Sequence, residues 1–116
     1  MKATRIHAGS DGITRFEDFE VPLEDAGSVG RLSADWPANA MVFRETDENY
    51  DFDWHPAPRK QWIVLLDGRI VIETGDGEVR EFGGGDLLCV EDTEGRGHRT
   101  KQLSKGVRRS LFIAIP

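Results

Sequence analysis

Two histidines are the residues of this chain best suited to chemistry, and they lie at the two ends of one segment. His55 opens the stretch HPAPRKQ, and His98 closes the stretch EGRGH. An imidazole can act as a general acid or base near neutral pH, and its unprotonated nitrogen binds divalent metals well. If the strands between them fold back on one another, the two rings meet at one mouth of a barrel. The structural alternative is that His55 caps a proline-rich corner and His98 makes hydrogen bonds inside the barrel.

Arg59 is the candidate for binding an anion. It has the same strand parity as His55 and Gln61, and a guanidinium can bind a carboxylate through two parallel hydrogen bonds. The alternative for Arg59 is a solvated corner shared with Lys60. Cys89 is expected to be a small core residue, because nothing around it suggests an activated thiolate.

Short apolar runs must position these side chains. Between the two histidines, the runs WIVLL, RIVIE and DLLCV and the mixed run EVREF are separated by DG, GDG and GGG. Asp67-Gly68 and Gly75-Asp76-Gly77 are strong hairpin signals, because tight primed turns need positive φ angles. The segment is therefore predicted to be an antiparallel meander. Upstream of it, period-two alternation places Asp51 and Asp53 on the same face as His55, in an edge or bulged corner.

The strand that begins at Gln61 is apolar on both faces. If Gln61 points inward with Ile63, the outward row is Trp62, Val64 and Leu66. A strand that is apolar on both faces is buried on both, so the outside of this sheet should meet a second sheet or a second subunit. We therefore expect a homodimer.

The spacing of these residues resembles the first motif of the cupin superfamily, which reads HxH, then Glu, then Gly. His55 stands at the first histidine, Ala57 at the second, Gln61 at the glutamate and Gly68 at the glycine. The second motif of that family starts with a glycine and ends in PxGxxH. Here Gly85-Asp86 resembles its start, Gly95 and His98 match the GxxH, and Thr93 replaces the proline.

The resemblance implies an all-β fold, a double-stranded β-helix or jelly-roll barrel, and frequent turns with little helical periodicity agree with it. It also implies a divalent metal such as iron, manganese, nickel or zinc, carried over here to His55, Gln61 and His98. Because Gln61 is a weak, uncharged ligand, low occupancy or no metal is the alternative. Asp51, Asp53 and Glu45 are candidates for the missing carboxylate.

Two functions follow from the resemblance and the parity of the strands. One is a metal-dependent oxygenase, isomerase or lyase that acts on a small polar or aromatic acid bound in the barrel mouth. The alternative is a non-catalytic, metal-free cupin that binds or senses a small molecule at the same place. The predicted substrate-binding positions are Arg59, Ala57, Thr100 and Gln102, the last two on the strand face of His98. No catalytic residue is assigned.

At 116 residues the chain is expected to be one domain, with an N-terminal strand and cover segment at 1–40 and a barrel core at 41–116. The first residues, MKATRIHA, are predicted to form an edge strand, and Trp36 to plug an end of the barrel. Hydrophobic residues make up 38% and charged residues 31%, which excludes a wholly disordered chain.

The distribution of charge and the lack of targeting signals limit the classes of partner that we expect. After Glu94 the chain has six basic and no acidic residues, whereas the residues before that stretch include 9 basic and 21 acidic ones. Because the whole protein carries −6, a basic strand surface that balances the acidic part is favoured over nucleic-acid binding. The chain shows no apolar run of membrane-spanning length, no signal peptide and one cysteine, so we expect a cytoplasmic protein without membrane contact.

Overall fold

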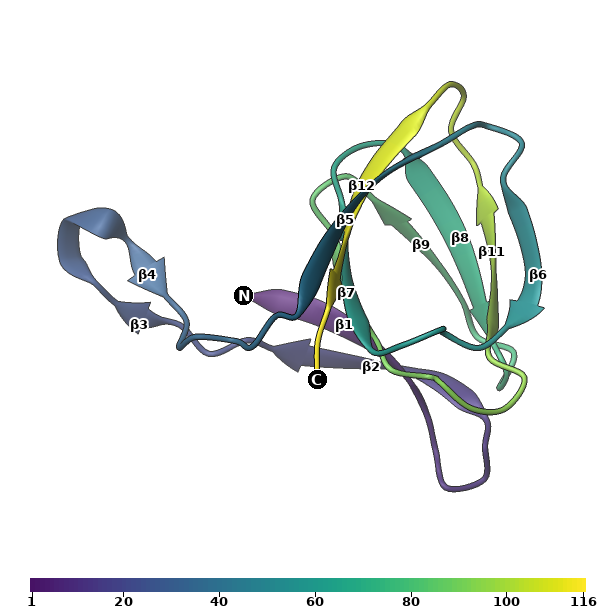
Figure 1. The fold of residues 1–116 in the computed structure, drawn as a ribbon, viewed down its shortest axis with the longest axis horizontal. Coiled ribbons are helices and arrows are strands. Elements are labelled where there is room, and N and C mark those ends of the chain that lie inside the picture. The colour runs from purple at the N-terminus through teal and green to yellow at the C-terminus, as the bar shows by residue number, and fades with distance from the viewer.

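A computed structural model describes residues 1–116, and its regular secondary structure is almost entirely β-strand, as predicted (Figure 1). The elements in chain order are β1 (Lys2–Ala8), β2 (Thr14–Glu20), β3 (Glu24–Asp25), the 3₁₀ turn η1 (Gly27–Val29), β4 (Arg31–Leu32), β5 (Ala40–Thr46), β6 (Asp51–His55), β7 (Gln61–Leu65), β8 (Arg69–Thr74), β9 (Val79–Gly83), β10 (Leu87–Val90), β11 (His98–Gln102) and β12 (Arg108–Ala114). With one 3₁₀ turn as its helical content, the chain has no helix able to cross a membrane.

Two sheets form the body of the protein. The six-stranded sheet has the order β2-β1-β10-β7-β12-β5, and the four-stranded sheet has the order β6-β11-β8-β9. Neighbouring strands are antiparallel except β1 and β10, which run parallel. The inner faces pack against each other around a shared core, which contains Ile6, Phe16, Ala57, Leu65, Ile70, Ile72, Phe82, Leu88 and Val90. This architecture is the predicted cupin-like jelly roll.

The middle of the chain is not the predicted meander. The Asp67-Gly68 turn carries the chain from β7 in one sheet to β8 in the other, whereas the turn after Thr74 does close a hairpin between β8 and β9. In that hairpin the backbone N–H of Thr74 donates to the carbonyl of Glu78 at 3.0 Å. Gly68 has a φ of 73°, so the turn signal correctly predicted a positive φ. A local signal cannot specify which sheet the following strand joins, because that depends on distant partners.

The N-terminal strands are part of the larger sheet. β1 lies between β2 and β10, so the prediction of an edge strand for MKATRIHA is wrong. The alternating apolar residues of β1 and β2 explain this placement, since Ile6 and Phe16 both belong to the core.

Residues 23–38 form an arm that projects from the body (Figure 1), and its short strands β3 and β4 pair only with each other. Trp36 does not plug the barrel. Its ring packs edge-on against Trp62 with centroids 5.5 Å apart, and Trp62 has the outward parity of β7.

A glycine at the start of β11 allows two stretches of backbone to approach closely where the histidines meet. Gly97 has a φ of 80°, and a Cβ atom at this position would overlap the carbonyl oxygen of His55. Gly77 in the β8–β9 hairpin has a φ of 88°, but a Cβ atom there would meet no other atom within 4 Å. Alanine substitutions at the two glycines therefore distinguish the cost of a positive φ from the cost of a close contact.

We predict that Gly97→Ala destabilises the protein far more than Gly77→Ala. The left-handed backbone costs an alanine about 1–2 kcal/mol at either position, which lowers the melting temperature by roughly 4–8 °C in a domain near this size. Only Gly97→Ala adds the overlap with His55, so its melting temperature should fall at least twice as far. Equal shifts, measured by thermal denaturation, would contradict the close approach.

Candidate functional site

A cavity of about 320 Å³ lies between the inner faces of the two sheets. Ten of its 18 lining residues are hydrophobic. The apolar walls come from both sheets and include Ile6, Ile63, Ile70, Ile72, Leu88 and Val90. The polar or charged lining residues are Arg44, His55, Gln61, His98, Thr100 and Arg108, and Tyr50, one of the ten hydrophobic residues, adds a hydroxyl. A small cavity with mostly apolar walls and a few convergent polar groups is the usual form of a small-molecule site.

The two histidines meet at one end of this cavity. His55 on β6 and His98 on β11 are directly opposed in the antiparallel pair, and their ring centroids are 4.7 Å apart. Ring proximity was the central spatial hypothesis from the sequence, and the strand register explains it.

A register shift in β6 changes which residues accompany His55. Opposite β11, the pairing passes from His98 with His55 to Thr100 with Phe52, so β6 has one extra residue there. Such a bulge reverses the alternation of side chains. Phe52 therefore lines the cavity with His55, at a ring-centroid distance of 3.8 Å, while Asp51 and Asp53 are exposed. The sequence predicted an edge or a bulged corner here, and β6 is an edge strand with a bulge, but the prediction that the two aspartates share the face of His55 is wrong.

His98 is held by an aspartate that sequence reasoning missed. Asp92 is 0% exposed, and its Oδ2 atom lies 2.5 Å from Nδ1 of His98 and accepts a hydrogen bond from the hydroxyl of Thr14 at 3.2 Å. Because a carboxylate only accepts hydrogen bonds, Nδ1 of His98 is the donor and Nε2 is left free. An acidic residue just after the apolar strand β10 was the signal that could have identified Asp92.

His55 has a similar arrangement with a backbone partner. Its Nδ1–H donates to the carbonyl oxygen of Asp53 at 2.7 Å. Burial lowers the pKa of His55 below its ordinary value of 6.5, so the ring is mainly neutral at pH 7. The Nε2 atoms of His55 and His98 make no hydrogen bond within the protein. Neither atom is fully buried, and both residues line the cavity, so both atoms are accessible from it.

The opposite end of the cavity contains two arginines. Arg108 is 2% exposed, its Nε–H donates to Oε1 of Gln102 at 3.1 Å, and it forms no ion pair with an acidic residue. Burial and then the charge of Arg44 lower the pKa of Arg108, although a guanidinium stays charged. Arg44 stacks over Tyr50 and Phe112, with its Cζ atom 4.9 and 5.0 Å from the two ring centroids.

Sequence reasoning missed Arg44 and Tyr50, and its placement of Arg108 on a basic strand surface is wrong. The available signal was parity: Arg108 is in phase with Ser110 and Ala114, which are also buried. A charged residue in phase with the buried face of a strand was the signal that Arg108 points inward.

The other predicted site residues fall in different places. Gln61, Ala57 and Thr100 line the cavity, and Gln61 is buried on the inward face of β7 as expected from its parity. Gln102 is buried behind the lining, where it holds Arg108. Arg59 is exposed and does not line the cavity, because the Pro-flanked corner turns it toward solvent.

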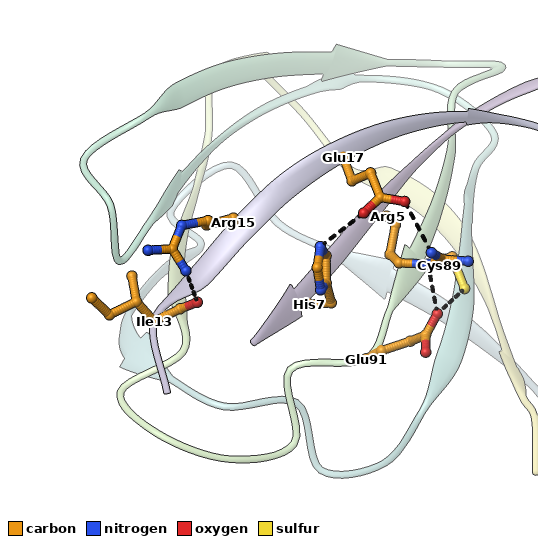
Figure 2. A network of polar contacts seen from close by, with 7 residues as sticks. All are labelled: Arg5, His7, Ile13, Arg15, Glu17, Cys89 and Glu91. Atoms are coloured by element: carbon orange, nitrogen blue, oxygen red, sulfur yellow. Dashed lines mark hydrogen bonds and ion pairs between the residues drawn. The ribbon is translucent and has the colours of Figure 1, made fainter. Parts of the chain in front are cut away.

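His7 and Cys89 lie outside the cavity, in a polar network shared by β1, β2 and β10 (Figure 2). Nε2 of His7 is 3.2 Å from Oε2 of Glu17, and the thiol of Cys89 donates to Glu91 at 3.3 Å. Burial and the carboxylate of Glu91 raise the pKa of Cys89 to about 12. The thiol is therefore inert at neutral pH, in agreement with the sequence-based expectation.

The residues at the cavity do not fit a resident divalent metal. No group of three or more His, Cys, Asp or Glu side chains is arranged to hold an ion. Gln61 is a weak third ligand, and Arg44 and Arg108 add positive charge to the same cavity. No carboxylate lines it. The acidic candidates from the sequence are all exposed: Glu45, Asp51 and Asp53.

One of the comparisons with known proteins supports the fold. No protein-family model and no curated protein matches the sequence. Among solved structures, a putative ethanolamine utilization protein Q from Salmonella typhimurium is similar over 100% of this chain and 96% of that chain, with a TM-score of 0.51 and 16% identity. Protein NMB1881 from Neisseria meningitidis is similar over 66% of this chain and 74% of that chain, with a TM-score of 0.49 and 17% identity. The first likeness shows a cupin-like fold and nothing about the ligand.

We predict that His55 makes the stability of the protein depend on pH. Because its pKa is lower in the folded than in the unfolded state, the unfolded chain takes up the proton first as the pH falls below 6.5. Relative to His55→Gln, the wild-type protein should lose stability from pH 6.5 down to the pKa of the folded state. Denaturant unfolding of both proteins at pH 8, 6.5 and 5 measures this. A stability difference that is the same at all three values would contradict the lowered pKa.

Proposed function

We propose that the cavity binds a small organic carboxylate with an apolar body, and that it does so without a resident metal. The observation that carries this proposal is the guanidinium of Arg108, which is 2% exposed and has no acidic partner. An uncompensated charge in a protein interior is costly, so buried charges are normally paired. The carboxylate of a ligand supplies the missing partner.

The geometry of the arginine end suits an anion. The terminal nitrogens of Arg108 have no protein partner and are not sealed from the cavity, so they remain available as donors. A carboxylate can accept two parallel hydrogen bonds from one guanidinium, and Arg44 adds a second positive charge. Between the arginines and the histidines, the walls are mainly isoleucine, leucine and valine, which favour an apolar ligand body.

The second candidate function is a metal-dependent oxygenase, isomerase or lyase at the same cavity. It is supported by the two imidazoles, which donate their Nδ1–H groups to oxygen acceptors as metal-bound histidines usually do. It comes second because the remaining donor is the amide of Gln61 and the cavity contains two arginines.

We predict that Arg108→Met weakens binding of benzoate and hexanoate at least tenfold, because each acid loses a charge-assisted pair worth about 1.5–3 kcal/mol. Arg109→Met is the matched control. Arg109 is the next residue, but it is exposed and paired with Asp67 at 2.7 Å, so its loss should leave affinity unchanged. Isothermal titration calorimetry of the folded proteins measures both. Equal effects of the two substitutions, or no binding of either acid to the wild type, would contradict the proposal.

Metal removal separates the two candidate functions. Dialysis against a chelator should leave the affinity for benzoate unchanged, and elemental analysis of the isolated protein should find no stoichiometric iron, manganese, nickel or zinc. A metal that is bound by the wild type and absent from both His55→Ala and His98→Ala would favour the metal-dependent enzyme.

We also propose a homodimer through the outer face of the six-stranded sheet. Two rows of directly opposed side chains cross β5, β12, β7 and β10 on this face. The rows are Phe43-Leu111-Val64-Leu87 and Met41-Ile113-Trp62-Cys89. They include no charged residue, and Phe43 is 75% exposed. The row predicted from sequence contributes Trp62 and Val64, whereas Leu66 lies beyond the end of β7.

A second copy of the chain is the partner that fits this face. The arm at residues 23–38 leads into β5 and carries two exposed apolar side chains, Val29 and Leu32. An isolated two-stranded hairpin is marginally stable in water. In a two-fold dimer each arm can cover the face of the other subunit, which buries both apolar surfaces at once. The uncharged rows also let two copies of net charge −6 meet without strong repulsion.

We predict that Phe43→Glu shifts the protein from dimer to monomer, because it places a charge in the centre of an apolar contact. Light scattering should give twice 13.0 kDa for the wild type at micromolar concentration and a single chain mass for the variant. Val79→Glu on β9 is the control, since Val79 is 55% exposed but belongs to the other sheet. A monomeric wild type would contradict the proposed dimer.

A further inference from the structure

The cavity has two polar ends separated by apolar walls. On β11, His98 and Gln102 are four residues apart, which corresponds to roughly 13 Å along a strand. His55 is opposite His98, and Arg108 is hydrogen-bonded to Gln102. The histidines and the arginines therefore mark opposite ends, with isoleucine side chains between them.

The histidine end offers hydrogen-bond acceptors. Both Nδ1 atoms are engaged by oxygen atoms of Asp53 and Asp92, so each proton is on the nitrogen that faces away from the cavity. The Nε2 atom of neutral His55 then has a lone pair that no protein group satisfies. An unsatisfied acceptor in a largely apolar cavity favours a ligand that brings a donor.

The arginine end offers only donors, because a guanidinium has no acceptor. A ligand that satisfies both ends must therefore present a carboxylate at one end and a hydrogen-bond donor at the other, joined by an apolar spacer. A cavity of about 320 Å³ is at the small end of the range for ligand sites and has room for a substituted ring.

From this arrangement we infer that the ligand is a hydroxy acid whose hydroxyl lies opposite its carboxylate, and that His55 and His98 select for the hydroxyl. The inference rests on the proposed carboxylate site and adds the chemical class of the ligand. A phenolic acid such as 4-hydroxybenzoate has this form, since its ring holds the two groups apart. Its hydroxyl donates to Nε2 of a histidine while Arg108 binds its carboxylate.

The test compares 4-hydroxybenzoate with benzoate and with 4-methoxybenzoate, which keeps the oxygen but has no donor. The wild-type protein at pH 7.5 should bind 4-hydroxybenzoate about tenfold more tightly than either analogue, the effect expected for one net hydrogen bond. His55→Ala and His98→Ala should reduce this preference to less than about threefold in at least one of the two variants. Arg108→Met should weaken all three acids together and leave their order of affinity unchanged.

The outcomes separate this inference from the proposed function. Binding of benzoate without any preference for the hydroxyl, or a preference that survives in both histidine variants, would overturn the inference and leave the carboxylate site standing. No binding of any acid to the wild type would overturn both. If either variant fails to fold, nitrogen-15 NMR of the wild-type histidines gives the answer. An Nε2 resonance should move with 4-hydroxybenzoate and not with benzoate, and equal movement would overturn the inference.

Discussion

The interior of this protein is shaped by a positive charge that its own chain does not neutralise. Arg108 projects from a central strand into the space between the sheets, where Gln102 occupies its Nε and no acidic residue is present. At this end of the barrel the guanidinium groups of Arg108 and Arg44 both stack over the ring of Tyr50, and neither contact neutralises their charge. In the proposed function, the cavity accommodates an anion and the charge of Arg108 favours its binding.

The other end of the barrel is organised by a chain of contacts around the two imidazoles. Asp92 is fully buried and fixes His98, the register of β11 against β6 fixes His55 beside it, and Gly97 permits the close backbone approach. One oxygen of Asp92 has no partner, so part of the cost of burying this carboxylate is not offset by hydrogen bonds. Interior polar groups that reduce stability in this way are typical of positions kept for recognition or chemistry.

The wall between the cavity and the outer apolar face is a single sheet. β12 shows this most clearly, since Arg108 and Phe112 point into the cavity while Leu111 and Ile113 point outward. Contacts made on the outer face would therefore restrict the strand that positions the arginine. In a dimer, the precision of the carboxylate site and the stability of the assembly would depend on the same strands.

The sequence alone determined the features that follow from local alternation and turn chemistry. Short runs with period two and glycine turns predicted an all-β fold, the parity of Gln61 predicted the inward face of β7, and the Pro-rich corner predicted an edge or a bulged corner. The tertiary structure decided what depends on distant partners. The Asp67-Gly68 turn changes sheets, an extra residue in β6 replaces Asp51 and Asp53 by Phe52, and Arg44 meets Arg108 from a separate strand. The physical reason is that side-chain alternation is set within a few residues, whereas sheet membership and register are set by which remote surfaces bury each other.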